Sequence, residues 1–160
     1  MKRLEFLHGK LLLGLSLSIM ATLLFIFTSL LFGFINGGGN PIPHSEKMAY
    51  VFLFTINYLT FAIMLTFFIR RAGLGIILFL AYLVVEFLMM QFINWKLSTF
   101  VGSLFPLQAS DELLPNPLMR TLGNATGMQS APVMYCVGMS LFYLSAYYFI
   151  LQRKLLKSDL

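Results

Sequence analysis

The sequence predicts an all-α integral membrane protein with four transmembrane helices and both termini in the cytoplasm. Of the 160 residues, 59% are hydrophobic and only 11% are charged, whereas soluble domains average about 25% charged residues. A helix needs about 20 residues to cross a bilayer core about 30 Å thick. Four apolar runs reach that length, at residues 11–35, 48–69, 74–93 and 132–151. We therefore expect residues 1–160 to form a single transmembrane domain.

The basic residues predict the orientation of these spans. The second and third runs are separated only by residues 70–73, and so short a connection reverses the chain into a helical hairpin. Lys and Arg are retained on the cytoplasmic side during insertion, so Arg70 and Arg71 place this turn in the cytoplasm. The same orientation puts three basic residues outside (Lys47, Lys96 and Arg120) and eight inside (Lys2, Arg3, Lys10, Arg70, Arg71, Arg153, Lys154 and Lys157).

The net charge of +5 is explained by this topology. We therefore expect the chain to have the lipid bilayer and not a nucleic acid as its partner. We expect it to lie in the cell inner (plasma) membrane.

The first run follows a basic lead, residues 1–10, which resembles the start of a signal peptide. Signal peptides have an apolar region of about 7–15 residues, and this run has 25, so we expect it to be retained as a tilted span. Gly14, Ser18 and Thr22 recur every four residues, a pattern that favours close helix packing. Residues 36–43 (NGGGNPIP) predict a flexible link, and Ser45 a cap for the second span.

Residues 94–131 form the predicted extracytoplasmic segment. Apolar side chains are spread through it, prolines interrupt it, and Ser110, Asp111 and Glu112 are typical of the start of a short helix. One interpretation is short re-entrant or interfacial helices between the third and fourth spans. The other is a structured surface loop anchored at the membrane interface by Trp95. The fourth span then begins at Pro132, where a missing N–H costs little.

The motifs of common enzymes are missing from the chain. It contains no GxxxxGK[ST], HExxH, CxxC or GxSxG. The two histidines, His8 and His44, fall on opposite sides of the predicted membrane, and Cys136 lies alone in an apolar run. We therefore expect no catalytic residue, no cofactor and no metal site.

Glu86 is the candidate functional residue within the spans. A carboxylate near the centre of a membrane helix costs about 3 kcal/mol to insert, so such residues are functional candidates. Glu86 lies twelve residues after Leu74, and Asn57 twelve residues before Ile69, each about 18 Å from the cytoplasmic edge. The same count brings Thr22 and Ser140 to this level, which predicts a polar layer at mid-membrane.

Two interpretations of Glu86 remain open. In the functional one, Glu86 lines a translocation path or a dimer seam. In the structural one, a hydrogen bond from Glu86 to Asn57 holds the hairpin, worth about 0.6 kcal/mol.

Four segments resemble the membrane subunits (permeases) of ABC-2 type ABC transporters. Individually weak, they occur in the family's order and spacing over nearly the whole chain. They are residues 3–11 (RLEFLHGKL), 68–74 (FIRRAGL) with Tyr82 and Glu86, 104–109 (LFPLQA) with 114–117 (LPNP), and the basic ending 151–154 (LQRK) with 158–160 (SDL).

This resemblance implies a permease that moves substrate across the membrane with energy from a separate ABC ATPase subunit. It also implies a homodimer, or a heterodimer with another permease. The candidate contact with the ATPase comprises Arg3, Glu5, Phe6, Arg70 and Arg71. The family has six helices, and this sequence matches it from the third onward, without the first two helices and most of the coupling segment. Either Met1 is an internal methionine of a longer reading frame, or the chain is a truncated or divergent relative.

Two alternatives from other classes remain. A four-helix membrane scaffold or assembly protein has no transport path and needs only the packing stripes. A small channel or sensor subunit needs polar residues lining a pore, and the spans contain few.

Overall fold

The computed structural model describes residues 3–35, 46–69, 71–97, 100–114 and 131–157. Within these ranges all regular structure is helical. The elements are α1 (Arg3–Ile35), α2 (Glu46–Phe68), α3 (Ala72–Leu97), the 3-10 helix η1 (Val101–Leu104), α4 (Gln108–Asp111) and α6 (Val133–Lys157). Four of them, α1, α2, α3 and α6, are long and apolar enough to cross a membrane. The predicted class, a multi-pass helical membrane protein, is confirmed.

Each of the four long helices is longer than the apolar run predicted for it. Helix α1 begins at Arg3, because no helix breaker separates the basic lead from the apolar run, and α6 continues through the basic tail to Lys157. Pro132 directly precedes α6, and its carbonyl accepts the first helical hydrogen bonds, from Tyr135 and Cys136. The predicted link at residues 36–43 and the Ser45 cap lie outside the described residues.

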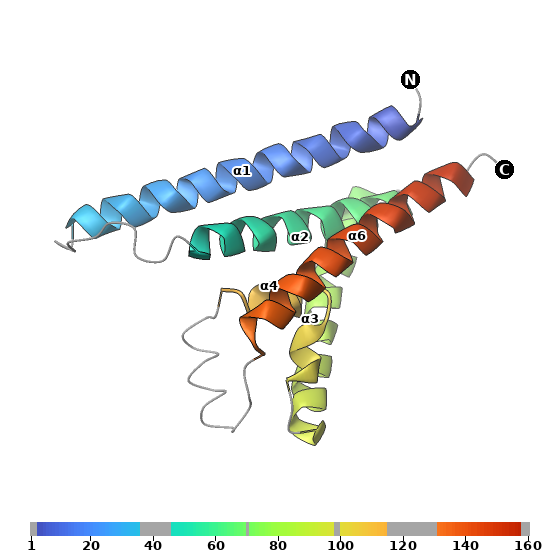
Figure 1. Ribbon diagram of the computed structural model, residues 1–160. Coiled ribbons are helices and arrows are strands. Elements are labelled where there is room, and N and C mark those ends of the chain that lie inside the picture. Colours follow the sequence, from blue (N-terminus) through green and yellow to red (C-terminus); the bar gives the residue numbers. More distant parts are fainter. Residues whose placement is uncertain (1–2, 36–45, 70, 98–99, 115–130, 158–160) are drawn as a thin grey trace.

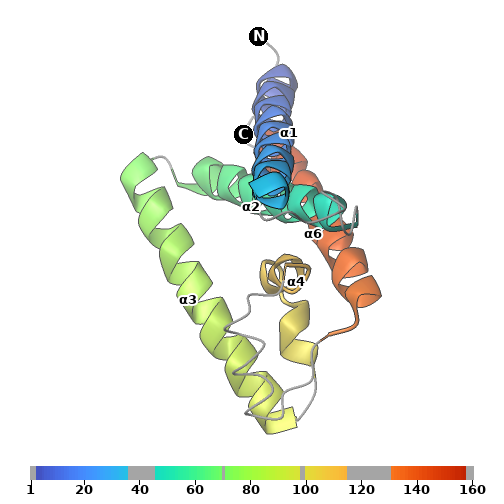
Figure 2. The same cartoon turned by 90° about the vertical axis from the view of Figure 1, so that its left-hand side faces the viewer.

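The long helices form a packed group of three and one divergent member (Figures 1 and 2). Helices α1 and α2 run antiparallel side by side, and α6 packs against both. Helix α3 leaves the end of α2 at a steep inclination. Among the described residues its backbone comes close to α2, η1 and α4, but not to α1 or α6. The space between α3 and α6 is occupied by η1 and α4, as Figure 2 shows.

The predicted stripe of small residues packs α1 against its neighbours. Gly14 and Ser18 are buried and Thr22 is half-buried. A Cβ atom added at Gly14 would lie 3.0 Å from Cδ1 of Ile63 on α2, so the missing side chain allows the close approach. The Ser18 and Thr22 hydroxyls donate to carbonyls of their own helix, those of Gly14 and Ser18. Both hydroxyls therefore have an acceptor within α1, and neither leaves an unpaired donor in the helix interface.

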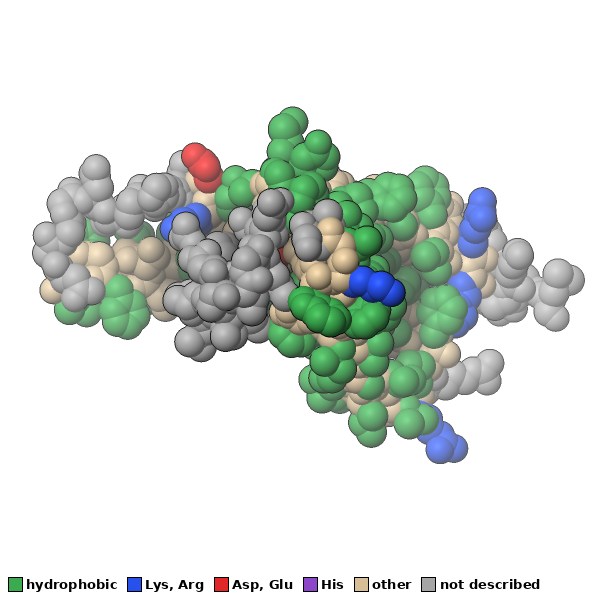
Figure 3. All heavy atoms as spheres, turned by 90° about the horizontal axis from the view of Figure 1, so that it is seen from below, with side chains coloured by type: hydrophobic (Ala, Val, Ile, Leu, Met, Phe, Trp, Pro, Cys, Tyr) green, Lys and Arg blue, Asp and Glu red, His purple; other side chains and the backbone are tan. Residues whose placement is uncertain are grey.

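The start of α1 and the end of α6 lie at the same end of the molecule, here called the terminal end (Figure 1). There the ammonium of Lys154 on α6 donates to the carbonyl of Phe67 at 2.7 Å and lies 3.5 Å from the centre of the Phe68 ring. Helix α2 has no basic residue in its own last turn, so α6 supplies the cation that its C-terminal carbonyls favour. In Figure 3 the Lys and Arg side chains on the visible face are few and lie apart from one another, with apolar side chains over much of the surface between them.

Candidate functional site

The chain between α3 and α6 folds back into the interior of the molecule. We call residues 101–112 the inner segment; it comprises η1, the turn after it, α4 and Glu112. Gly102, Ser103 and residues 107–110 are buried, and Figure 2 shows α4 between α3 and α6, below α2. Within residues 100–114 this arrangement confirms short helices between the third and fourth spans and not a surface loop. Residues 98–99 and 115–130 of the predicted extracytoplasmic segment lie outside the described residues. Trp95, at the end of α3, is exposed, and its role as a membrane anchor stays a prediction.

A helical break in the inner segment leaves backbone groups that need partners. Phe105 is extended, and Pro106 has no N–H, so the helical path stops after η1 and restarts at α4. No side chain of the inner segment caps α4 at Leu107. Instead the carboxyl oxygen Oε1 of Glu86 on α3 accepts hydrogen bonds from the backbone nitrogens of Leu107 at 2.8 Å and Gln108 at 3.2 Å.

Glu86 therefore performs from another helix the function that an N-cap side chain normally performs locally. This explains why the predicted helix start at residues 110–112 is wrong. Helix α4 begins at Gln108 and ends at Asp111. The side chain that caps its start lies on another helix, so the residues next to α4 in the sequence do not mark where it begins.

Helices α2 and α6 hold the inner segment through three further side chains. Asn57 donates through Nδ2 to the carbonyl of Pro106 at 3.2 Å, and the Tyr143 hydroxyl donates to that of Leu104 at 3.1 Å. The Tyr58 hydroxyl donates to Oδ1 of Asp111 at 2.6 Å. With Glu86 on α3 included, each of the three surrounding long helices, α2, α3 and α6, contributes a polar side chain that binds the inner segment near its break.

Asn94 and Gly102 join η1 to the far end of α3. Oδ1 of Asn94 accepts from the backbone nitrogen of Gly102 at 2.7 Å, and its Nδ2 donates to Oγ of Ser103 at 3.2 Å. A Cβ atom at Gly102 would lie 2.6 Å from the carbonyl oxygen of Met90. Only glycine allows η1 to approach the α3 backbone this closely.

The structure brings together some of the predicted polar layer but not all of it. Glu86 and Asn57 bond to adjacent stretches of the inner segment and not to each other, so the direct hydrogen bond expected between them is wrong. The inner segment comes between them. Thr22 donates within α1, and the backbone of α1 does not come close to that of α3, so Thr22 does not join Glu86. Ser140 is fully buried on α6.

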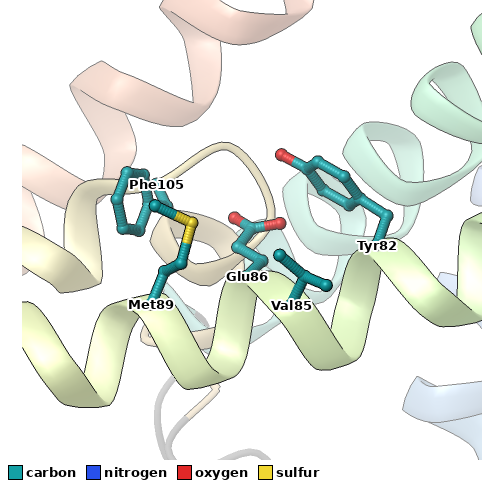
Figure 4. Close-up of a pocket in the computed structure, with 5 residues that line it drawn as sticks. All are labelled: Tyr82, Val85, Glu86, Met89 and Phe105. Atoms are coloured by element: carbon teal, nitrogen blue, oxygen red, sulfur yellow. The ribbon is translucent and has the colours of Figure 1, made fainter.

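Some buried polar atoms in this region have no hydrogen-bond partner among the described residues. They are Oδ1 of Asn57, Oε2 of Glu86, Oγ of Ser140 and the hydroxyl of Tyr147. A small pocket of about 100 Å³ opens beside Glu86 and is lined by Tyr82, Val85, Glu86, Met89 and Phe105. In Figure 4 the Glu86 carboxyl lies between the Tyr82 ring on one side and the Met89 and Phe105 side chains on the other.

Asp111 lies outside the four long helices and is the second carboxyl at this site. Burial raises the pKa of Asp111 to about 6 from its ordinary value of 3.8. The hydrogen bond from Tyr58 acts in the opposite direction, and the nearby carboxylates Glu86 and Glu112 add to the increase. Asp111 therefore titrates closer to neutral pH than an exposed aspartate.

Sequence reasoning missed most of the residues that hold the inner segment. Tyr58, Asn94 and Tyr143 were not singled out for it, and Asp111 was expected only at the start of a short helix. The signal that could have found them is their position, because Tyr58, Asn94 and Tyr143 lie in the long helices and need polar partners there. Their partners are mainly backbone groups, which leave no mark in the sequence.

The candidate ATPase contact is only partly described. Glu5 and Phe6 are exposed on the first turn of α1, and Arg71 is exposed at the start of α3. The Phe6 ring meets that of Phe67 edge-on at 6.2 Å, and the ammonium of Lys10 lies 4.8 Å from the Phe6 ring centre. The start of α1 therefore packs on the end of α2. Arg70 lies outside the described residues, and Arg3 is described in its backbone only.

The fold and this site together define a multi-pass helical membrane protein with an interrupted segment enclosed by its long helices. No protein-family model, no curated protein and no solved structure matches the chain. The resemblance to ABC-2 permeases therefore rests on the sequence motifs alone.

Proposed function

We propose that this chain is a permease subunit of an ABC-2 type transporter in the inner (plasma) membrane. It moves substrate with energy from a separate ABC ATPase on the cytoplasmic side. The observation that carries the proposal is the inner segment, an interrupted helical stretch enclosed by α2, α3 and α6 and bonded to a polar side chain of each. Segments of this kind are typical of transporters, in which broken helices form the substrate path.

The depth of the inner segment supports this assignment. Pro106 and Leu107 are bonded to Asn57 and Glu86, and both of these residues lie about 18 Å along their helices from the turn at residues 70–73. For a helix at right angles to the bilayer, this distance along the helix corresponds to a depth near the centre of a core about 30 Å thick. Non-helical backbone at membrane depth is tolerated only where protein buries it or where it lines a water-filled cavity. We infer that the inner segment re-enters the membrane from the outer side.

The exposed apolar surface supports a dimer in the bilayer. Large hydrophobic side chains are exposed along α1, α3 and α6. In Figure 2, α3 and α6 lie at opposite sides of the structure and α1 lies at its top. Lipid covers such a surface, and so does a second permease, whether another copy of this chain or a related one.

A membrane scaffold is the second candidate. The observation that favours it is that each hydrogen bond of Glu86 and Asn57 described above goes to the inner segment. These bonds stabilise the fold and imply no substrate.

The test of the proposed function is recovery of an ABC ATPase. The tagged chain is purified from native membranes in a mild detergent, and the co-purifying proteins are identified by mass spectrometry. We expect an ATPase with a GxxxxGK[ST] loop, and its recovery falls in the double charge reversal Arg3→Glu with Glu5→Arg. Lys96→Glu, at the end of α3 away from the termini, is the matched control and leaves recovery unchanged. If no such ATPase is recovered, the scaffold is favoured.

A further inference from the structure

The pocket beside Glu86 has one feature that its internal contacts do not use. Glu86 is only 4% exposed, and Oε2 of its carboxyl has no hydrogen-bond partner among the described residues. The other oxygen, Oε1, is engaged by two backbone N–H groups. A buried polar atom without a partner loses its hydration and gains nothing in return. Among the described side chains, only the Tyr82 hydroxyl acts as a donor toward the Glu86 carboxyl, and it makes no close, well-aligned hydrogen bond to Oε2. Oε2 therefore keeps the capacity to accept a further donor.

The surroundings indicate which kind of donor fits. The titratable side chains that interact with Glu86 are Asp111 and the four tyrosines Tyr58, Tyr82, Tyr143 and Tyr147. None of these groups is basic, so the carboxyl has no cationic partner among them. A donor that also carries positive charge complements this set, because a charge-assisted hydrogen bond to a carboxyl oxygen is stronger than a neutral one.

The walls of the pocket indicate what the donor is attached to. Val85, Met89 and Phe105 are apolar, and the Tyr82 and Phe105 rings offer aromatic faces that attract a cation. Val85 and Met89 are also exposed on the outer face of α3, so the pocket opens onto an apolar surface (Figure 4). A volume of about 100 Å³ accommodates an ammonium group with the first carbons of its chain, and the rest of a larger molecule extends outward.

We propose that this pocket binds a primary ammonium group carried on an apolar chain, with the ammonium donating to Oε2 of Glu86. This inference names the class of ligand that Glu86 binds at the proposed transport site. The biological use of that binding rests on the proposed function. Two sources share this chemistry, a free alkylamine and the amine headgroup of a phospholipid.

The test measures binding of n-butylammonium to the purified full chain in nanodiscs of phosphatidylcholine, which has no primary amine. Isothermal titration calorimetry is the readout, and 1-butanol is the neutral probe of similar shape. We expect butylammonium to bind at least about tenfold more tightly than butanol. Equal binding of both probes, or no binding of butylammonium, overturns the proposal.

Two neighbouring valines provide a matched pair of variants. Val85 lines the pocket and Val84 does not, although the two are 52% and 59% exposed on the same helix. Val85→Phe fills the pocket and is expected to weaken butylammonium binding at least about tenfold, whereas Val84→Phe leaves it unchanged. Glu86→Gln keeps an acceptor for the inner segment and is expected to weaken binding similarly. Unchanged binding in Val85→Phe or in a folded Glu86→Gln overturns the proposal, and the valine pair decides if Glu86→Gln does not fold.

A second bilayer composition tests whether a lipid or a free amine supplies the ammonium group. If a lipid supplies the ammonium, phosphatidylethanolamine in the nanodisc competes with butylammonium; if a free amine supplies it, the affinity is the same in both bilayers.

Binding is measured without an ATPase. Intact binding in a protein that recovers no ATPase therefore contradicts only the proposed function. An ATPase-coupled protein without butylammonium binding contradicts only this inference.

Discussion

Oε1 of Glu86 lies 2.8 Å from the backbone nitrogen of Leu107, twenty-one residues further along the chain. This single contact joins the buried carboxyl of α3 to the start of α4. It converts a costly intramembrane carboxyl into the cap of a helix that has no cap of its own. The contact between Glu86 and Leu107 therefore matters both for the fold and for the proposed function.

Variants at Glu86 separate its capping role from a transport role. Glu86→Leu removes the acceptor for two buried N–H groups and is expected to cost about 1–3 kcal/mol of stability. Glu86→Gln keeps the acceptor, so its stability should stay within about 1 kcal/mol of the wild type. Thermal unfolding in a mild detergent measures both. Lost transport in a stable Glu86→Gln supports the translocation path, whereas full transport leaves only the structural role.

Gly102 should tolerate no larger side chain. Gly102→Ala places a methyl group where Met90 and Asn94 atoms lie within 3.0 Å, and overpacking of this kind costs about 1–3 kcal/mol. Gly138→Ala on α6 is the matched control, because a Cβ there meets nothing within 4 Å and alanine is the better helix former. Equal melting temperatures for the two variants would show that η1 does not pack closely on α3.

Asp111 should make stability depend on pH in a defined direction. Its pKa is raised from 3.8 to about 6 in the folded protein, so between these values the folded state binds more protons than the unfolded one. The free energy of unfolding therefore falls as pH rises from 4 to 6.

Asp111→Asn keeps an oxygen that accepts from Tyr58 and should remove this slope. Glu112→Gln is the comparison variant: it removes one charge that adds to the increase, so the slope should become smaller but remain. Unfolding in detergent measured at intervals from pH 4 to 7 gives the comparison, and an unchanged slope in Asp111→Asn contradicts the assignment.

The orientation of the spans remains a prediction from charge, and labelling tests it. In a Cys136→Ala background, cysteines are placed at Ser45 and at Ala72, and an impermeant thiol reagent is added to intact cells. We expect Ser45→Cys to react and Ala72→Cys to react only after the membrane is opened, because the turn beside Arg70 and Arg71 is cytoplasmic. The opposite pattern reverses the topology and places the ATPase contact on the wrong side.

The helical class and the four long helices were determined by the sequence by itself. Apolar length and the stripe of Gly14, Ser18 and Thr22 are local properties of one helix, and they are visible in the order of residues. The count from the hairpin turn also brought Glu86 and Asn57 to one level, because the rise per residue of a helix is constant.

Only the tertiary structure decided what those two residues do. Each meets backbone groups of the inner segment, which reaches them through a break at Phe105 and Pro106. Backbone N–H and carbonyl groups are the same at every residue, so no sequence pattern marks which of them a distant side chain will bind. The divergence of α3 was decided in the same way. It depends on a buried segment between helices, whose contacts form only once the chain has folded.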